Sequence, residues 1–251
     1  MTLLESLAVL LAGVAAGAIN VIVGSGTLIT FPTLLAVGYP PVLANVSNTI
    51  GLVPGSVSGV IGYRRELVGQ RSRLIRLGTA SVLGGITGAV LLLQLPEAAF
   101  QAIVPVLIAV GCVLVVAQPW ITRHVSPRPH APPHGSVTVW ILVYLAGVYG
   151  GYFGAAQGVL LIAIMGIGIT ETMQRINATK NVLTGSVNAV AAVVFIAVSD
   201  VAWQAAATIA VGAAIGGQLG STVGRRLPSA VFRGFVALVG VVAIVKLVAF
   251  P

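Results

Sequence analysis

Charged residues and cysteine are both scarce in this 251-residue sequence. Lys and Arg number 13, Asp and Glu number 5, and charged residues make up 7% of the chain. A soluble domain carries about 25% charged residues, and the mean hydropathy here is +1.06. These values exclude a soluble enzyme, a nucleic-acid-binding protein and a disordered protein. They predict an all-α integral membrane protein whose surroundings are the lipid bilayer.

Residue types that carry catalysis or bind metals are also few. Cys112 is the sole cysteine, and the three histidines fall in one proline-rich stretch. No His or Asp lies inside an apolar segment, and the five carboxylates lie at segment ends or in predicted loops. No phosphate-binding loop of the ATPase type occurs. We therefore expect no enzyme activity, no cofactor and no metal, and no carboxylate proton relay is evident.

Ten apolar segments organise the chain. Eight are long enough to span a bilayer: 3–23, 42–63, 77–95, 100–117, 136–153, 181–198, 202–223 and 231–250. Two are short, 27–37 and 159–169, and each follows a glycine-containing turn. The stretch 118–135 is polar and rich in proline. It predicts a cytoplasmic linker between a first unit, 1–117, and a second, 136–251.

The two units resemble each other. Residues 13–24 align with 147–158, 45–50 with 177–182, and 55–58 with 185–188. Three blocks in the same order, with a short segment at the same place in each unit, predict an internal repeat.

The distribution of arginine predicts the topology. Arginines cluster at 64–76, 123–128, 175 and 225–233, and such clusters face the cytoplasm in short loops. Ten crossings place all of them on one side, with both termini on the other. The two units then run in opposite directions, as two inverted five-segment repeats with short broken helices, a design found in secondary transporters.

The first glycine-rich turn carries a family resemblance. An Ala-Gly-x-x-Asn sequence ends at Asn20, Gly-Ser-Gly-Thr-Leu-Ile-Thr-Phe-Pro-Thr-Leu-Leu follows from Gly24, and Gly-Tyr-Pro-Pro closes the motif. This pattern resembles the opening motif of the TauE/SafE family, and residues 150–158 repeat it in degraded form, with Ala155 and Ala156 where that family has glycines. The resemblance implies transport of sulfite, organosulfonates or other sulfur-containing anions.

Polar residues at membrane depth form the candidate site. A helix that begins inside the protein presents free N–H groups and a partial positive charge to an anion, and amide side chains at helical spacing add donors. The expected substrate-binding residues are Asn20, Ser25, Gly26, Thr27, Asn45 and Asn48 from the first unit, with Gln157, Gly158, Asn177, Lys180 and Asn181 from the second. Structural alternatives are hydrogen bonds between helices for the Asn side chains and, for Lys180, snorkelling to the cytoplasmic end of its helix.

The sequence thus predicts a secondary transporter that moves a small anion across the plasma membrane of a prokaryote by alternating access. An anion channel and a carrier of small carboxylates are the alternatives, and a structural membrane anchor is a third. Coupling to Na⁺, to a proton carried by the substrate or to the anion gradient stays open. Pairs of small residues such as Gly13 and Gly17 pack helices within one chain or between chains, so a homo-oligomer is also left open.

Overall fold

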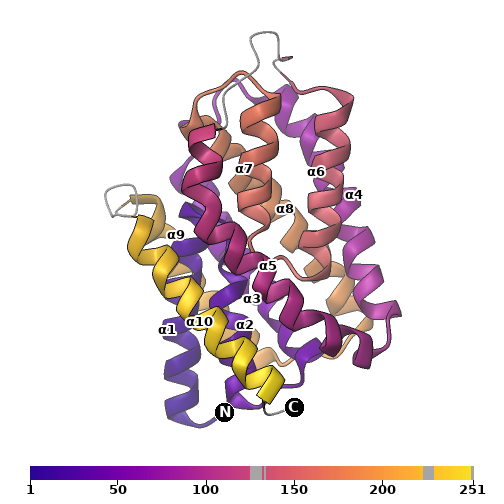
Figure 1. Ribbon diagram of the computed structural model, residues 1–251, viewed down its shortest axis with the longest axis vertical. Coiled ribbons are helices and arrows are strands. Elements are labelled where there is room, and N and C mark those ends of the chain that lie inside the picture. The colour runs from indigo at the N-terminus through magenta and orange to yellow at the C-terminus, as the bar shows by residue number, and fades with distance from the viewer. Residues whose placement is uncertain (125–131, 133, 223–228, 250–251) are drawn as a thin grey trace.

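The computed structural model of this chain is an assembly of helices (Figure 1). It describes residues 1–124, 132, 134–222 and 229–249, and no side chains for 229–232 and 246–249. Within these residues there are ten helices and no strand: α1 (Leu3–Ile22), α2 (Thr27–Val37), α3 (Pro41–Gly62), α4 (Arg71–Gln94), α5 (Glu97–His124), α6 (Val137–Tyr152), α7 (Gln157–Gly168), α8 (Met173–Val198), α9 (Trp203–Thr222) and α10 (Ser229–Ala249). The expected all-α fold is confirmed. Four of these helices, α1, α4, α5 and α8, are long and apolar enough to cross a bilayer, and the count of ten crossings stays a prediction.

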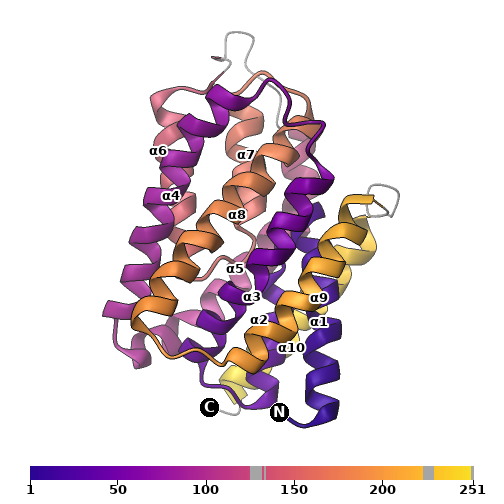
Figure 2. The same cartoon turned by 180° about the vertical axis from the view of Figure 1, so that it is seen from behind.

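Four helices form a central layer. Figure 2 shows α4, α8, α3 and α9 side by side in that order. Helix α6 packs against α4 at one edge of the layer, and α1 packs against α9 at the other. Helices α5 and α10 contact each other over the face seen in Figure 1. Each of the first five helices has a counterpart five places later in the chain, α1 with α6 and so on to α5 with α10. When the counterparts are exchanged, the same packed pairs result: α4–α6 becomes α9–α1, and α4–α8 becomes α9–α3. That pattern agrees with two similar halves, and their inverted orientation in a membrane stays a prediction.

Two helical hairpins, α1–α2 and α6–α7, reach into the molecule from opposite ends. In Figure 1 the first enters from the end that carries both termini, and the second enters from the other end. Gly24 and Gly154 end α1 and α6 with φ of +87° and +76°, a left-handed conformation that favours glycine. Their N–H groups donate to the carbonyls of Ile19 and Tyr149, both at 3.1 Å. The equivalent turns are therefore Gly24 and Gly154, and the alignment of Gly24 with Gly158 is wrong.

Matching hydroxyl groups of α3 and α8 hold the starts of two other helices. Ser47 on α3 accepts a hydrogen bond of 2.9 Å from the N–H of Ala202, directly before α9. Thr179 on α8 donates a hydrogen bond of 3.0 Å to the side chain of Gln70, directly before α4. Ser47 and Thr179 thus occupy corresponding positions in the two halves, and each forms a hydrogen bond with the residue directly before another helix.

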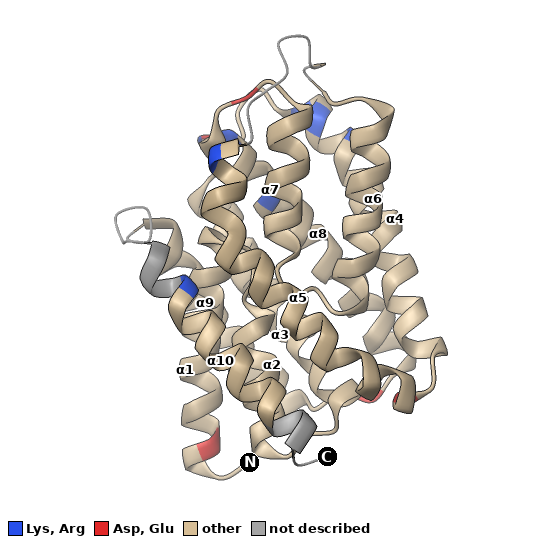
Figure 3. Cartoon of the chain, viewed as in Figure 1, with Lys and Arg blue, Asp and Glu red and all other residues tan. Residues whose placement is uncertain are grey.

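Basic residues gather at the end of the molecule opposite the termini, called here the arginine-rich end (Figure 3). There Glu171 pairs with Arg73 at 3.3 Å and with Arg175 at 2.9 Å. Burial raises the pKa of the Glu171 carboxyl. The N–H of Thr172 and the two arginines lower that pKa by more than burial raises it, so the pKa lies below its ordinary value. The pairs are charged at neutral pH, and their stabilising contribution is lost as the pH falls through that lowered pKa.

Three helix boundaries differ from the apolar segments by more than three residues. Helix α4 begins at Arg71 and α8 at Met173, ahead of the segments 77–95 and 181–198, because a helix extends beyond the apolar core of a bilayer. Helix α5 continues to His124 and takes up the start of the segment expected to be a linker, 118–135. Most of the remaining linker, and Arg128, Arg225 and Arg226 of the charge argument, lie outside the described residues.

Small residues bring the helices at both edges of the layer into backbone contact. A Cβ atom at Gly216 of α9 would lie 1.9 Å from the carbonyl oxygen of Val14 on α1. A Cβ atom at Gly88 of α4 would lie 2.0 Å from the carbonyl oxygen of Val148 on α6. These distances are far shorter than any tolerated contact, so the small residues pack helices within one chain here.

We expect Gly88→Ala to lower the free energy of unfolding by about 1–3 kcal/mol, because α4 and α6 must separate to admit the methyl group. Gly78→Ala in the same helix is the matched control, since a Cβ there meets no atom within 4 Å and alanine favours helix. Thermal unfolding of the purified protein in detergent compares the two. Equal stability of the two variants would contradict the close packing.

The hairpins make a topological prediction. Leu3 at the start of α1 and Leu95 after α4 should be reached from one side of the membrane, and Val68 before α4 from the other. All three side chains are exposed. Single cysteines at these positions, in a Cys112→Ser background, should react with a membrane-impermeant maleimide on intact cells at 3 and 95, and at 68 only after permeabilisation. Labelling of all three from one side would overturn this topology.

Candidate functional site

The turns of the two hairpins touch each other inside the protein. The N–H of Gly158 donates a hydrogen bond of 3.1 Å to the carbonyl oxygen of Gly24. A Cβ atom at Gly24 would lie 2.4 Å from the Cα atom of Gly158, so this approach requires glycine. The first residues of α2 and α7, Thr27 and Gln157, are both buried beside this contact. Two helix N-termini from opposite halves are thus brought together, and their depth in a bilayer stays a prediction.

Asn48 on α3 connects this centre to the start of α2. Its Nδ2 donates to Thr27 Oγ1 at 3.4 Å, and its Oδ1 accepts from the hydroxyl of Thr30. Asn48 itself is fully buried. Both polar ends of its amide are therefore used to fix the first turn of the short helix.

Lys180 on α8 binds the end of α1. Its Nζ donates to the carbonyl oxygens of Asn20 at 3.0 Å and Val21 at 2.9 Å, and the residue is 0% exposed. The last carbonyls of a helix have no partner inside that helix and carry a partial negative charge. A cation is therefore favoured at this position. The interpretation that Lys180 snorkels to the helix end is wrong, because its ammonium group is buried among backbone carbonyls.

A matching pair of amides joins each hairpin to the opposite half. Asn177 on α8 donates from Nδ2 to the carbonyl of Val21 at 3.4 Å. Asn45 on α3 donates from Nδ2 to the carbonyl of Tyr152 at 2.9 Å. The end of α1 is thus capped by α8, and the end of α6 by α3. At each helix break, a backbone carbonyl therefore accepts a hydrogen bond from a side chain of the other half of the chain.

Several polar atoms around this centre are buried without a hydrogen-bond partner in the protein. They are Ser25 Oγ, Asn45 Oδ1, Gln157 Nε2, Asn177 Oδ1 and Asn181 Nδ2. Buried polar groups are nearly always paired, so a group of unpaired ones needs a physical reason. Three of these atoms, Ser25 Oγ, Gln157 Nε2 and Asn181 Nδ2, can donate a hydrogen bond, whereas the two Asn Oδ1 atoms only accept. The three donors, with a buried ammonium and two helix N-termini, form a place suited to a small anion.

Two predicted residues take other roles. Asn20 contributes its backbone carbonyl to Lys180, and Gly26 lies against α1, where a Cβ atom would be 2.7 Å from the carbonyl of Ala16. Thr30 and the carbonyls of Val21 and Tyr152 were missed. A backbone acceptor carries no side-chain signature, so the sequence offers no signal for the last two.

The two hairpin tips differ in their surroundings. At the second tip, Phe153 packs edge-on against Phe31 of α2, with ring centres 5.1 Å apart, and against Phe100 of α5, at 6.2 Å. Phe31, Phe100 and Phe153 are all buried. At the first tip, Ile22 and Val23 line a cavity of about 420 Å³. The second tip is therefore packed by aromatic rings, while residues of the first tip line a cavity.

Comparison with known sequences identifies the family. The family described as Sulfite exporter TauE/SafE matches residues 9–247 of this chain. The chain belongs to this family. The resemblance seen in the opening glycine-rich motif is thereby confirmed. Membership in TauE/SafE, together with the four apolar helices, supports a multi-pass membrane protein.

Relatives of this TauE/SafE chain carry general names. It is 27% identical over 175 residues to the probable membrane transporter protein YfcA of Escherichia coli strain K12, which covers 66% of this chain and 64% of that protein. It is 29% identical over 150 residues to the probable membrane transporter protein ORF9 of a Sinorhizobium species, covering 57% and 54%. The match to these relatives thus spans less than two thirds of their length.

The bond between Thr30 and Asn48 predicts a stability difference. Thr30→Val removes the donor and leaves Asn48 Oδ1 buried and unpaired, which should cost about 1–3 kcal/mol in the free energy of unfolding. Thr33→Val is the matched control one turn later on α2. Its hydroxyl bonds only the carbonyl of Ile29 in its own helix, and its loss should cost about 0.5 kcal/mol or less. Thermal unfolding in detergent measures both, and equal losses would contradict this reading of Asn48.

Proposed function

We propose that this chain is a secondary transporter that moves a small sulfur-containing anion, such as sulfite or an organosulfonate, across the plasma membrane of a prokaryote by alternating access. The family and the names of the relatives support transport. The observation that carries the proposal is the buried meeting point of the two hairpins, with its unpaired donors and its single ammonium group.

The chemistry of the meeting point selects for negative charge. Lys180 uses two carbonyls as acceptors, and an ammonium group has three N–H donors, so one donor is assigned to the substrate. Ser25 and Gln157 at the two breaks, and Asn181 next to Lys180 on α8, supply neutral donors. A sulfite or sulfonate group presents three oxygens and needs several donors at once. Neutral donors around one cation bind such a group without holding it too tightly for release.

The hairpins supply a route to alternating access. Each reaches the centre from a different end of the molecule (Figure 1). The contact between Gly24 and Gly158 and the packing of Phe31 on Phe153 join the two hairpins. A movement of one hairpin relative to the other half would expose the centre to one side while the opposite tip stays packed. This arrangement favours a carrier over an anion channel, because the backbones of the two hairpins touch at the centre.

The unpaired atoms provide a test that separates transport from folding. Ser25 Oγ is buried and unpaired in the protein, so Ser25→Ala should leave the unfolding temperature unchanged or raised. The same change should lower transport about tenfold, because a donor to the anion is lost. Ser81→Ala is the matched control, since Ser81 Oγ is also buried and unpaired but lies on α4, outside the meeting point.

Uptake of radiolabelled sulfite, a short organosulfonate and acetate is measured in proteoliposomes that contain the purified protein. Each uptake is measured with and without the same unlabelled anion inside the vesicles. Saturable uptake of the sulfur anions that is stimulated by internal substrate supports the proposal. Preference for acetate would support a carboxylate carrier, and currents without saturation or stimulation would support a channel. Normal transport by Ser25→Ala would place the site elsewhere.

A further inference from the structure

The ends of α1 and α6 are equivalent helix breaks, but an ammonium group binds only the first. At the end of α1, the carbonyls of Asn20 and Val21 accept hydrogen bonds from Lys180 Nζ at 3.0 and 2.9 Å. The position of α3 that aligns with Lys180 is Asn48, whose amide is neutral and bonds the side chain of Thr27 instead. The end of α6 therefore lacks the positive charge that balances the end of α1.

Two carbonyls at the end of α6 receive no side-chain donor. The offset that aligns the two turn glycines assigns the carbonyls of Gly150 and Gly151 as counterparts of the two that Lys180 binds. Among the described residues, the side-chain donor to this last turn is Asn45, which bonds the carbonyl of Tyr152 at 2.9 Å. The last carbonyls of a helix carry a partial negative charge, so a cation is favoured beside them.

The amide of Asn45 carries an unpaired acceptor at this helix end. Its Nδ2 is used by the carbonyl of Tyr152, whereas its Oδ1 is buried without a hydrogen-bond partner. Asn45 is 1% exposed. An amide oxygen only accepts, and a buried acceptor without a partner needs a physical reason. A cation bound between Oδ1 and the end of α6 supplies that reason.

Oxygen atoms border open space beside Gly154. A Cβ atom at Gly154 would lie 3.0 Å from the carbonyl oxygen of Gly150, and the next heavy atoms outside the turn, which include Thr27 Oγ1, are at 3.8 Å. The amide of Gln157 packs on Gly150, where a Cβ atom would lie 2.4 Å from Oε1. Carbonyl, hydroxyl and amide oxygens of both halves thus come together at the end of α6.

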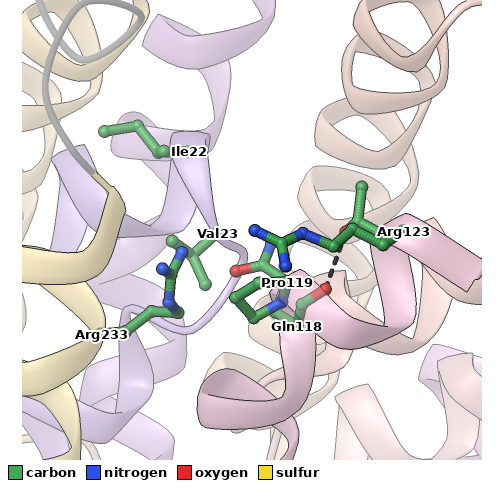
Figure 4. A pocket seen from close by; sticks show the side chains of 7 residues that line it. Ile22, Val23, Gln118, Pro119, Arg123 and Arg233 are labelled. Atoms are coloured by element: carbon green, nitrogen blue, oxygen red, sulfur yellow. Dashed lines mark hydrogen bonds between the residues drawn. The ribbon is translucent and has the colours of Figure 1, made fainter.

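The surroundings of the second break are less positive than those of the first. Figure 4 shows Arg123 and Arg233 beside Val23, at the tip of the first hairpin. At the second tip, Phe153 packs against aromatic rings instead. A cation at the second break therefore meets neutral side chains at the tip, where the first tip has guanidinium groups nearby.

The ligand chemistry favours a monovalent cation. Divalent ions such as Ca²⁺ are usually held by carboxylates, and the described part of the chain contains no group of His, Cys, Asp or Glu that would hold a metal. The oxygens at the end of α6 are all neutral. In transporters, carbonyls of broken helices and the C-terminal ends of half-helices coordinate Na⁺, and Na⁺ carries the same single charge as the ammonium group at the other break.

We infer that the end of α6 binds one Na⁺, through Asn45 Oδ1 and the carbonyls of Gly150 and Gly151, as the counterpart of the Lys180 ammonium at the end of α1. In its role as coupling ion, this Na⁺ rests on the proposed transport function. Gln157 connects the ion to the anion, since its Oε1 lies against Gly150 and its Nε2 is an unpaired donor. A bound Na⁺ orients this amide and adds a second positive charge, so Na⁺ and the anion bind cooperatively.

Thermal unfolding of the purified protein in detergent tests ion binding without transport. The chloride salts of Na⁺, K⁺ and choline are compared at the same ionic strength. Na⁺ at about 100 mM should raise the unfolding temperature by about 2–5 °C over choline, because an ion that binds only the folded state stabilises it. K⁺ should give less than half of this rise. Equal unfolding temperatures in the three salts would overturn the site.

Two variants place the ion at one break. Asn45→Ala removes the acceptor and should abolish the response to Na⁺. Asn177→Ala is the matched control, because Asn177 also donates to a helix-end carbonyl and also has an unpaired Oδ1, but Lys180 binds that helix end. It should keep the response. Loss of the response in both variants, or in neither, would contradict binding at the end of α6.

A third variant covers the case in which Asn45→Ala does not fold. Asn45→Asp keeps an oxygen at the Oδ1 position and adds a negative charge. Its unfolding temperature should therefore depend on Na⁺ at least as strongly as that of the wild type. An Asn45→Asp protein with equal stability in Na⁺ and choline would contradict the assignment.

Transport separates the coupling role from the proposed function. In proteoliposomes, replacing external choline by Na⁺ should lower the KM for sulfite about fivefold or more, whereas K⁺ should not. The same KM in all three salts would reject coupling to Na⁺ and leave the proposed function intact. Stabilisation by Na⁺ in a protein that transports none of the tested anions would instead reject the proposed function and retain the ion site.

Discussion

The hydrogen bond between Gly158 and Gly24 is the constraint on which the rest of the arrangement depends. At 3.1 Å it joins two backbones that belong to different hairpins, and it forms only because neither residue carries a side chain. The contact sets the position of both short helices and therefore of their free N–H groups. It also brings Gly158 beside Lys180, since a Cβ atom at Gly158 would lie 2.9 Å from the Cδ atom of that lysine. The glycines thus create the space in which a buried cation reaches the end of α1.

The capping of helix ends across the two halves gives the centre its polarity. Interrupting a helix inside an apolar protein leaves carbonyl and N–H groups that need partners. The carbonyls are supplied with donors by Asn45, Asn177 and Lys180. The corresponding position to Lys180 in the first half is Asn48, which instead holds the start of α2. This difference places the positive charge at one break only, so the two similar halves form an asymmetric centre.

Much of this architecture follows from the sequence, and the remainder has identifiable reasons. Apolar segments and flanking glycines predicted all ten helices and both breaks. Hydropathy could not locate the starts of α4 and α8, because it reports the apolar part of a helix and not its polar first turns. The arginine pattern could not tell a hairpin that turns inside the protein from two full crossings, since both return the chain to the same side. The partners of Lys180 could not be predicted because backbone carbonyls have no sequence signature. The left-handed turn at Ala156, with φ +61°, could not be predicted either, because glycine is the usual residue in that conformation.

The bond from Lys180 to the carbonyl of Asn20 also has a consequence in time. Its two partners are separated by 160 residues of chain, and a ribosome adds about 5–20 residues per second. The first break therefore exists for about 10–30 s before its lysine has been made. During that interval its carbonyls depend on water or on the insertion machinery for hydrogen bonds. The hydrogen bonds of the first break are thus complete only after Lys180 in the second half has been synthesised.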